Sequence, residues 1–158
     1  MTDSPKDLAI ALVSGGMDSL VTAGLARQEH AHLAFLHLNY GQKTERKEFD
    51  CFHKIAQHYG VPEKWRKVVD VTFLNQIGGS SLTDPSMRVT KYQGESAEIP
   101  SSYVPFRNTH IVSIAVSWAE VIGAKKIFIG AVEEDSSGYP DCRPEYYKAL
   151  NELIKVGT

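Results

Sequence analysis

The sequence predicts an α/β fold, a Rossmann-like doubly wound parallel sheet within a single domain of 158 residues. Short apolar runs of strand length alternate with longer segments whose apolar residues recur at helical spacing. The first run, residues 8–13, is continuously apolar, as expected for a strand buried on both faces of a parallel sheet. This alternation favours parallel strands joined by helical crossovers.

The first half of the chain supplies three strands and two helices in alternation. A helix that starts inside residues 14–19 is expected to end near Glu29, and residues 33–38 form the second strand. Gly60 and Pro62 terminate the next helix, as glycine and proline commonly do at a carboxyl end. The apolar face of that helix consists of Phe49, Phe52, Ile55, Ala56 and Tyr59. Residues 65–71 are then predicted as the third strand.

Residues 75–98 interrupt the alternation. They contain the pairs Gly78-Gly79 and Asp84-Pro85 and have almost no periodic apolar residues. A connection of this length is uncommon in a compact domain and is usually a binding loop, a lid or a disordered insert. We expect a mobile segment over the active site, and a disordered insert is the alternative.

Regular structure is expected to resume over residues 99–106. A long helix follows from about Thr109 to Ile122, with Asn108 or Thr109 capping its start and Gly123 closing its end. Because it is apolar nearly all round, this helix is predicted to be buried. Residues 126–130 form the fourth strand and residues 133–143 a loop. The last helix has Pro144 at its first position.

The composition excludes several functional classes. Hydrophobic residues make up 42% and charged residues 23%, which is typical of a globular domain. A net charge of −2 without a lysine and arginine cluster gives no indication of a nucleic-acid partner. The apolar stretches are too short for a transmembrane helix, so no membrane association is expected. Two distant cysteines, Cys51 and Cys142, fit a reducing compartment and therefore a cytoplasmic location.

Residues 14–19, Ser-Gly-Gly-Met-Asp-Ser, lie between the first strand and the first helix. Two adjacent glycines let the backbone approach an oxyanion closely, and the N–H groups that start a helix point toward such an anion. Ser14 and Ser19 add hydroxyl donors. The segment lacks the lysine of a Walker loop and the third glycine of the dinucleotide fingerprint. It predicts a nucleotide phosphate site, and an ordinary loop is the alternative.

The same segment resembles the pyrophosphate loop of the N-type ATP pyrophosphatases. Those enzymes activate a group by transferring AMP to it and expelling pyrophosphate. Ligands of open parallel sheets bind beyond the carboxyl ends of the strands, where the strand order reverses. Residues 14–19, 39–46 and 130–143 are predicted to lie there, which favours one composite site.

Four motifs extend the resemblance over nearly the whole chain, to the 7-cyano-7-deazaguanine synthase family of queuosine biosynthesis. They are residues 14–19, Tyr40-Gly41-Gln42, residues 104–108 and residues 135–144. The most specific is the run Gly-Tyr-Pro-Asp-Cys-Arg-Pro at residues 138–144. The resemblance implies an ATP-dependent carbon–nitrogen ligase that converts 7-carboxy-7-deazaguanine and ammonia into 7-cyano-7-deazaguanine (preQ0). ATP would activate the carboxylate, ammonia would give an amide, and a second activation would drive dehydration to the nitrile.

The resemblance also implies ATP with Mg²⁺ as the cofactor. The residues expected to bind ATP are Leu12, Val13, Ser14, Gly15, Gly16, Met17, Asp18, Ser19, Leu20, Leu38 and Asn39. Asp18, expected to be catalytic, would order the magnesium shell or cap the helix. An acid at that position could also simply offset the helix macrodipole. Leu38 and Asn39 would border the adenine or ribose, although the end of a strand explains them equally well.

A second set of residues is expected to contact the substrate, namely Tyr40, Gln42, Arg107, Asn108, Asp135, Tyr139 and Asp141. Arg107 is also expected to be catalytic, because its guanidinium fork suits a phosphate or the substrate carboxylate. An exposed arginine beside a helix start can also be merely solvated. Asp135, Tyr139 and Asp141 would read the deazapurine through its N–H donors and flat face. A polar turn is the alternative for those three.

One feature of the family is absent from this sequence. Family members carry a carboxyl-terminal segment with four cysteines that binds structural zinc, and that segment and a last strand are missing here. Cys51 and Cys142 cannot form a tetrahedral thiolate site, so no zinc ligand is expected within this chain. Family members commonly pair, so a homodimer is a further expectation.

Two other functions are compatible with the same fold. One is another ATP pyrophosphatase that thiolates or amidates a different acceptor such as a tRNA base, against which the weakly acidic net charge counts. The other is a truncated, non-catalytic nucleotide-binding module.

Overall fold

The computed structural model describes residues 5–82, 84, 86–87, 99–131 and 138–158. In this part of the chain, parallel strands form one sheet in the order β3-β2-β1-β4. The strands are β1 (Leu8–Leu12), β2 (His32–Asn39), β3 (Arg66–Asp70) and β4 (Lys126–Phe128). The chain builds outward from β1 through β2 to β3 and then returns to place β4 on the other side of β1. The predicted doubly wound parallel sheet is therefore confirmed.

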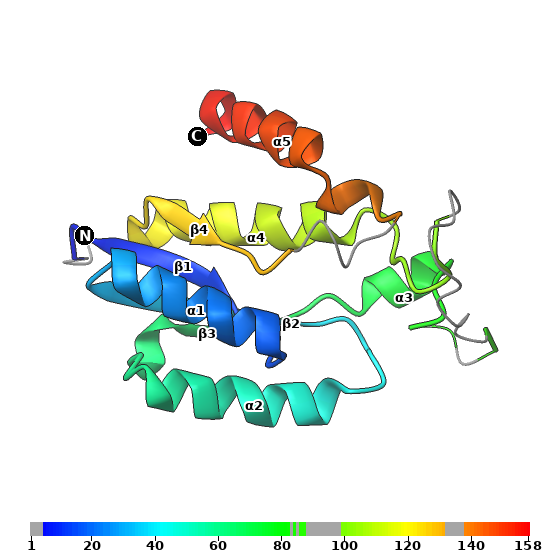
Figure 1. Ribbon diagram of the computed structural model, residues 1–158, viewed down its shortest axis with the longest axis horizontal. Helices are drawn as coiled ribbons and strands as arrows, with labels where there is room; N and C mark the ends of the chain where they lie inside the picture. Colours follow the sequence, from blue (N-terminus) through cyan, green and yellow to red (C-terminus); the bar gives the residue numbers. More distant parts are fainter. Residues whose placement is uncertain (1–4, 83, 85, 88–98, 132–137) are drawn as a thin grey trace.

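Helices cover both faces of the sheet. They are α1 (Met17–Glu29), α2 (Glu45–His58), α3 (Phe73–Ile77), α4 (Arg107–Ile122) and α5 (Pro144–Gly157), with the short 3-10 helices η1 (Glu63–Trp65) and η2 (Pro140–Cys142). Figure 1 shows α2 on one side of the sheet and α4 and α5 on the other. Helix α1 shares a core with α2. None of the helices in the described ranges is both long and apolar enough to cross a bilayer.

Strand β1 lies at the centre of the molecule and is buried along its whole length. Its side chains alternate between two cores, as the pleat of a strand requires. Leu8 and Ile10 pack in the core formed with α4 and α5, whereas Ala9 and Ala11 pack in the core formed with α1 and α2. The prediction of a strand buried on both faces is confirmed.

The long helix α4 differs from its prediction in two respects. It begins at Arg107, and its N-cap is Phe106 in the left-handed conformation (φ 57°), so neither Asn108 nor Thr109 caps it. Its apolar circumference is also not fully buried, since Val121 is 75% exposed. The helix packs in a core shared with the sheet and α5, and this packing leaves Val121 exposed. Its predicted end at Gly123 is confirmed, because this glycine is left-handed (φ 72°).

The segments on either side of residues 88–98 also depart from expectation. Residues 99–106 form turns rather than regular structure, and the short helix α3 was not predicted. Part of the predicted mobile segment packs against the domain, because the Ser80 hydroxyl donates to the Ser102 carbonyl (3.2 Å) and the Ser81 N–H to the Ser101 carbonyl (2.8 Å). Residues 83, 85 and 88–98 lie outside the described residues, so the mobility of this segment stays a prediction.

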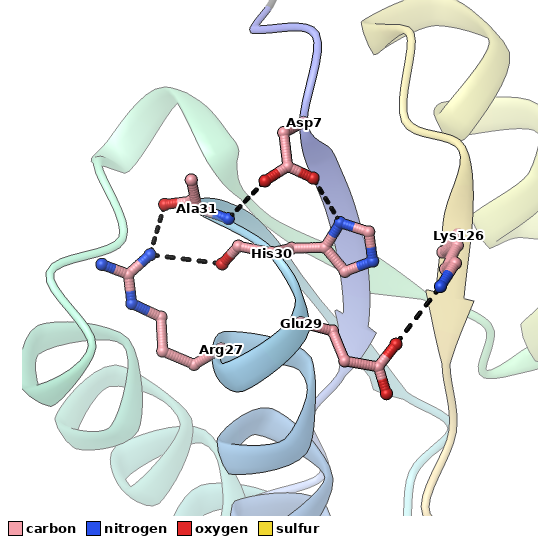
Figure 2. Close-up of polar contacts among 6 residues, drawn as sticks. All are labelled: Asp7, Arg27, Glu29, His30, Ala31 and Lys126. Atoms are coloured by element: carbon pink, nitrogen blue, oxygen red, sulfur yellow. Dashed lines mark hydrogen bonds and ion pairs between the residues drawn. The ribbon is translucent and has the colours of Figure 1, made fainter.

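Polar contacts tie together the amino ends of β1 and β4. The Asp7 carboxylate pairs with Nδ1 of His30 (2.6 Å) and accepts the N–H of Ala31 (2.7 Å), and Lys126 pairs with Glu29 (3.2 Å). Figure 2 shows these contacts between the end of α1 and the two strands. The hydrogen bond from Ala31, followed by that from His30, holds the pKa of Asp7 below its usual value. This end of the sheet is therefore pinned by structural contacts.

Candidate functional site

A cavity of about 280 Å³ lies at the opposite end of the sheet, where β1, β2 and β4 finish. Its walls consist of Leu12, Val13, Ser14, Gly16, Asp18, Ser19, Leu36, Leu38, Tyr40, Glu48, Arg107, Asn108, Ile111, Ile129 and Gly130. Strands β1 and β4 flank the point where the strand order reverses. This is the position at which open parallel sheets bind their ligands.

The turn between β1 and α1 forms one wall of the cavity. Gly15 has a positive φ of 92°, and a side-chain carbon there would lie 2.5 Å from the carbonyl oxygen of Glu48 and 3.0 Å from Cβ of Cys51. Only glycine fits this conformation and this close approach of α2 to the turn. Gly16 is the N-cap of α1 and is extended, and no side chain caps the helix from that position. The N–H groups of the first turn can therefore bind an anion.

The two serines of the turn hold its shape. Oγ of Ser19 accepts the N–H of Gly15 (3.1 Å) and donates to the carbonyl of Gly16 (2.8 Å). Oγ of Ser14 accepts the N–H of Gly16 (3.3 Å). Both serines also line the cavity, so a bound phosphate would meet a turn that is already folded.

The end of β4 packs closely against the start of α1. A side-chain carbon on Gly130 would lie 2.8 Å from Oγ1 of Thr22 and 3.1 Å from the carbonyl oxygen of Asp18. Asp18 itself is exposed, and it lines the cavity from the first turn of α1. Asp18 therefore shares the cavity with the turn that precedes it, and the end of β4 packs against its backbone.

Arg107 and Tyr40 form another part of the wall. Nη1 of Arg107 donates to the Tyr40 hydroxyl (3.3 Å), and the guanidinium lies 5.5 Å from the centroid of the Tyr40 ring. Burial raises the pKa of Tyr40, and the positive charge of Arg107 opposes that rise. The phenol is therefore neutral at pH 7. A guanidinium has five N–H donors, so Arg107 can bind Tyr40 and an oxyanion in the cavity together.

Glu48 is a cavity residue that the sequence did not predict. Gln42 is buried behind the wall, where its Oε1 accepts the N–H of Tyr40 (3.0 Å) and its Nε2 donates to Glu48 (2.9 Å). The Thr44 hydroxyl donates to the other oxygen of Glu48 (2.5 Å). Glu48 lies inside a helix, and no motif surrounds it. The nearby turn Tyr40-Gly41-Gln42 was the one feature of the sequence that could have indicated its place in the cavity wall. The carboxylate is thus held in place at the cavity wall.

Most of the predicted ATP-binding residues meet at the cavity, and some do not. Those in its wall are Leu12, Val13, Ser14, Gly16, Asp18, Ser19 and Leu38. Gly15 supports the turn from behind, whereas Met17 (78% exposed) and Leu20 (41%) are largely solvent-exposed. Asn39 follows Leu38 on the opposite face of β2, where its Oδ1 lies 3.0 Å from Nε2 of His37. Nucleotide contacts by these residues stay predictions.

The predicted substrate-binding residues divide in the same way. Tyr40, Arg107 and Asn108 line the cavity, whereas Gln42, Tyr139 and Asp141 are outside its wall. The Tyr139 hydroxyl bonds to the Ser102 hydroxyl (2.6 Å), and the Asp141 carboxylate accepts the N–H of Asn108 (2.9 Å). Asp135 lies outside the described residues. Substrate contact by the residues outside the wall stays a prediction.

The described side chains do not fit a zinc site. In this part of the chain, no group of three or more histidine, cysteine, aspartate or glutamate side chains could hold a metal ion. Cys51 is on α2 and Cys142 is in η2, and no disulfide joins them. Asp18 does suit Mg²⁺, because that ion is commonly bound by one or two carboxylates together with substrate phosphates.

The chain is similar in sequence to proteins of one family. The family model described as "Queuosine biosynthesis protein QueC" matches residues 8–158. The 7-cyano-7-deazaguanine synthase of Chlorobium limicola is 56% identical over 150 residues, which cover 95% of this chain and 66% of that protein. The enzyme of the same name from Chlorobaculum tepidum is 57% identical and is covered to 65%. The chain thus spans just under two thirds of the length of these relatives.

Solved structures resemble the chain more weakly. The U34-tRNA thiolase NcsA from Methanococcus maripaludis aligns with 78% of this chain, and this chain covers 37% of it, at 18% identity and a TM-score of 0.49. A similarity this low has no bearing on function. The family model and the close relatives agree with the four sequence motifs, and they confirm the resemblance drawn from them. The chain belongs to the QueC family of queuosine biosynthesis proteins.

Proposed function

We propose that the protein is an ATP-dependent carbon–nitrogen ligase that converts 7-carboxy-7-deazaguanine and ammonia into 7-cyano-7-deazaguanine. The observation that supports this most directly is the cavity at the strand-order reversal. One wall of it is a glycine turn at the uncapped start of α1, and another carries Arg107. A triphosphate and a carboxylate are the two anions that such walls would bind. Relatives with more than half of their aligned residues identical are named for this product.

The turn at residues 14–19 would bind the β- and γ-phosphates of ATP. Backbone N–H groups of the first turn of α1 are the donors, and the two serines keep them in position before the nucleotide arrives. Such fixed donors stabilise charge where it develops on the departing phosphates. Asp18 would hold Mg²⁺, which neutralises charge on the leaving pyrophosphate when it is bound.

Arg107 would orient the substrate carboxylate toward the α-phosphorus. A carboxylate oxygen attacks that phosphorus, the bond to the β-phosphate breaks, and pyrophosphate leaves. Ammonia then attacks the activated carbonyl carbon, and AMP departs with one carboxylate oxygen to leave an amide. The amide oxygen then attacks the α-phosphorus of a second ATP, and pyrophosphate leaves again. The amide nitrogen loses its two protons, and the oxygen departs as part of a second AMP to leave the nitrile. Tyr40 would keep the guanidinium in place through its ring and its hydroxyl.

Three finer parts of the proposal rest on the resemblance and the composition. They are free ammonia as the nitrogen donor, a homodimeric assembly and a cytoplasmic location.

The proposal is tested by incubating the protein with ATP, Mg²⁺, ammonium and 7-carboxy-7-deazaguanine labelled with ¹⁸O in its carboxylate. Mass spectrometry should detect amide or nitrile together with AMP that carries one ¹⁸O atom per molecule. ATP binding without any AMP would instead identify a non-catalytic nucleotide-binding module. AMP that is formed only when tRNA is added would identify a different ATP pyrophosphatase.

A further inference from the structure

Asp141 carries a charged side chain and is nevertheless buried, with 3% of its surface exposed. It lies in η2, and its Oδ2 accepts the backbone N–H of Asn108 at 2.9 Å. Asn108 is the second residue of α4, and it precedes Asp141 by 33 positions in the sequence. The carboxylate therefore reaches the start of a helix that is remote from it along the chain.

Helix α4 needs such a partner because it has no cap of its own. Its N-cap residue, Phe106, has a left-handed backbone and an apolar side chain, and it makes no capping hydrogen bond. The first N–H groups of a helix lack partners within the helix, and one that is buried without a partner is costly. A carboxylate at this position satisfies the N–H of Asn108 and also interacts favourably with the helix dipole.

A second contact runs in the opposite direction. Nδ2 of Asn108 donates to the backbone carbonyl of Asp141 (2.9 Å) and to Sγ of Cys142 (3.4 Å). Nearby, the Thr109 hydroxyl bonds to the Tyr146 hydroxyl (2.7 Å). The start of α4 is thus fixed to η2 and α5 by reciprocal hydrogen bonds.

The residues held by this contact are the ones that face the cavity. Asn108 lines the cavity, and so does Arg107, whose guanidinium binds Tyr40. Asp141 itself does not line it. Asp141 would therefore affect ligand binding indirectly, by fixing the position of the first turn of α4.

We propose that Asp141 is a positioning residue, whose carboxylate caps α4 and thereby holds Arg107 and Asn108 in the cavity wall. This role replaces, for Asp141, the direct substrate contact expected from the resemblance. Only the identity of the anion at Arg107 rests on the proposed function.

Hydrogen exchange tests the cap independently of any activity. Asp141→Ala should accelerate exchange of the backbone N–H groups at residues 107–110 about fivefold or more, the usual effect of losing a helix cap. Asp141→Asn should exchange within about twofold of the parent, since asparagine caps as well as aspartate. Asp50→Ala, an exposed carboxylate on α2, is the matched control and should leave this region unchanged. Unchanged exchange in Asp141→Ala would overturn the proposal.

Ligand binding separates positioning from direct contact. Calorimetry with 7-carboxy-7-deazaguanine and a non-hydrolysable ATP analogue should show about tenfold weaker binding for Asp141→Ala, whereas Asp141→Asn should bind like the parent. Equal weakening in both variants, with parent-like exchange in Asp141→Asn, would show that the charge meets the ligand and would overturn the proposal. If the Ala variant fails to fold, Asp141→Glu replaces it, because it keeps the charge but displaces the cap. If the parent protein binds neither ligand, the proposed function is refuted. The hydrogen-exchange experiment still tests whether Asp141 caps α4.

Discussion

Gly15 and Gly16 are adjacent in the sequence but should respond in opposite ways to the same substitution. At Gly15 an added methyl group meets the carbonyl oxygen of Glu48 at 2.5 Å, on a backbone with φ of 92°. The left-handed backbone costs about 1–2 kcal/mol for a residue with a side chain. Forcing a methyl group against packed backbone adds about 1–3 kcal/mol. Gly15→Ala should therefore lose roughly 2–5 kcal/mol of unfolding free energy.

Gly16→Ala is the matched control for stability. Gly16 has an extended backbone (φ −81°, ψ 171°), and the nearest atom to an added methyl group is Oγ of Ser14 at 3.5 Å. Its unfolding free energy should fall by no more than about 1 kcal/mol, because the backbone is unstrained and alanine is only a poorer N-cap than glycine. The methyl group would nevertheless stand at the cavity wall, where a phosphate oxygen approaches the backbone. Affinity for Mg²⁺–ATP should fall at least about tenfold.

Urea unfolding followed by tryptophan fluorescence measures the first effect, and calorimetric titration of Mg²⁺–ATP measures the second. A stable Gly15→Ala protein would refute the close packing of α2 beneath the turn. Parent-like ATP affinity in a folded Gly16→Ala protein would refute the assignment of the turn to the phosphates.

Three further predictions concern single side chains. Asp18→Ala should lower Mg²⁺-dependent pyrophosphate release at least about tenfold while shifting the unfolding free energy by under about 0.5 kcal/mol, and an equal loss of both would contradict its role. Arg107→Lys keeps the charge but loses the fork that also contacts Tyr40. It should weaken 7-carboxy-7-deazaguanine binding about tenfold by calorimetry, and parent-like binding would count against the assigned contact. The folded pKa of Asp7 lies below its usual 3.8, so its contribution to stability is present above that value and disappears as the pH falls through the folded pKa. Asp7→Asn should therefore unfold at lower urea than the parent near about pH 6, with the difference closing toward about pH 2; a difference that is constant with pH would exclude this linkage.

The sheet and the turn at residues 14–19 could be predicted because their signals are local. The continuous apolar run of β1 indicates a buried strand, and the glycine pair that follows it indicates a turn whose backbone can approach an anion. The positions of Leu12, Val13 and Leu38 in the cavity wall follow from the rule that ligands bind beyond the carboxyl ends of parallel strands.

Contacts that depend on distant segments could not be predicted in this way. The cap of α4 comes from Asp141, 33 residues after the Asn108 N–H that it binds, and no local pattern links the two. The sequence therefore favoured Asn108 or Thr109 as the cap. Glu48 was missed for a similar reason, because its place in the wall depends on the packing of α2 beneath Gly15. The exposed side of α4 includes apolar residues such as Val121. The sequence of this helix alone therefore does not distinguish its exposed side from its buried side.

The central claim is that the turn before α1 binds the outer phosphates of ATP. Isothermal titration calorimetry with Mg²⁺–ATP and, separately, with AMP tests it most directly, because AMP lacks the β- and γ-phosphates. The account predicts that ATP binds at least about tenfold more tightly than AMP. No heat from Mg²⁺–ATP with folded protein, or equal affinity for the two nucleotides, would contradict it.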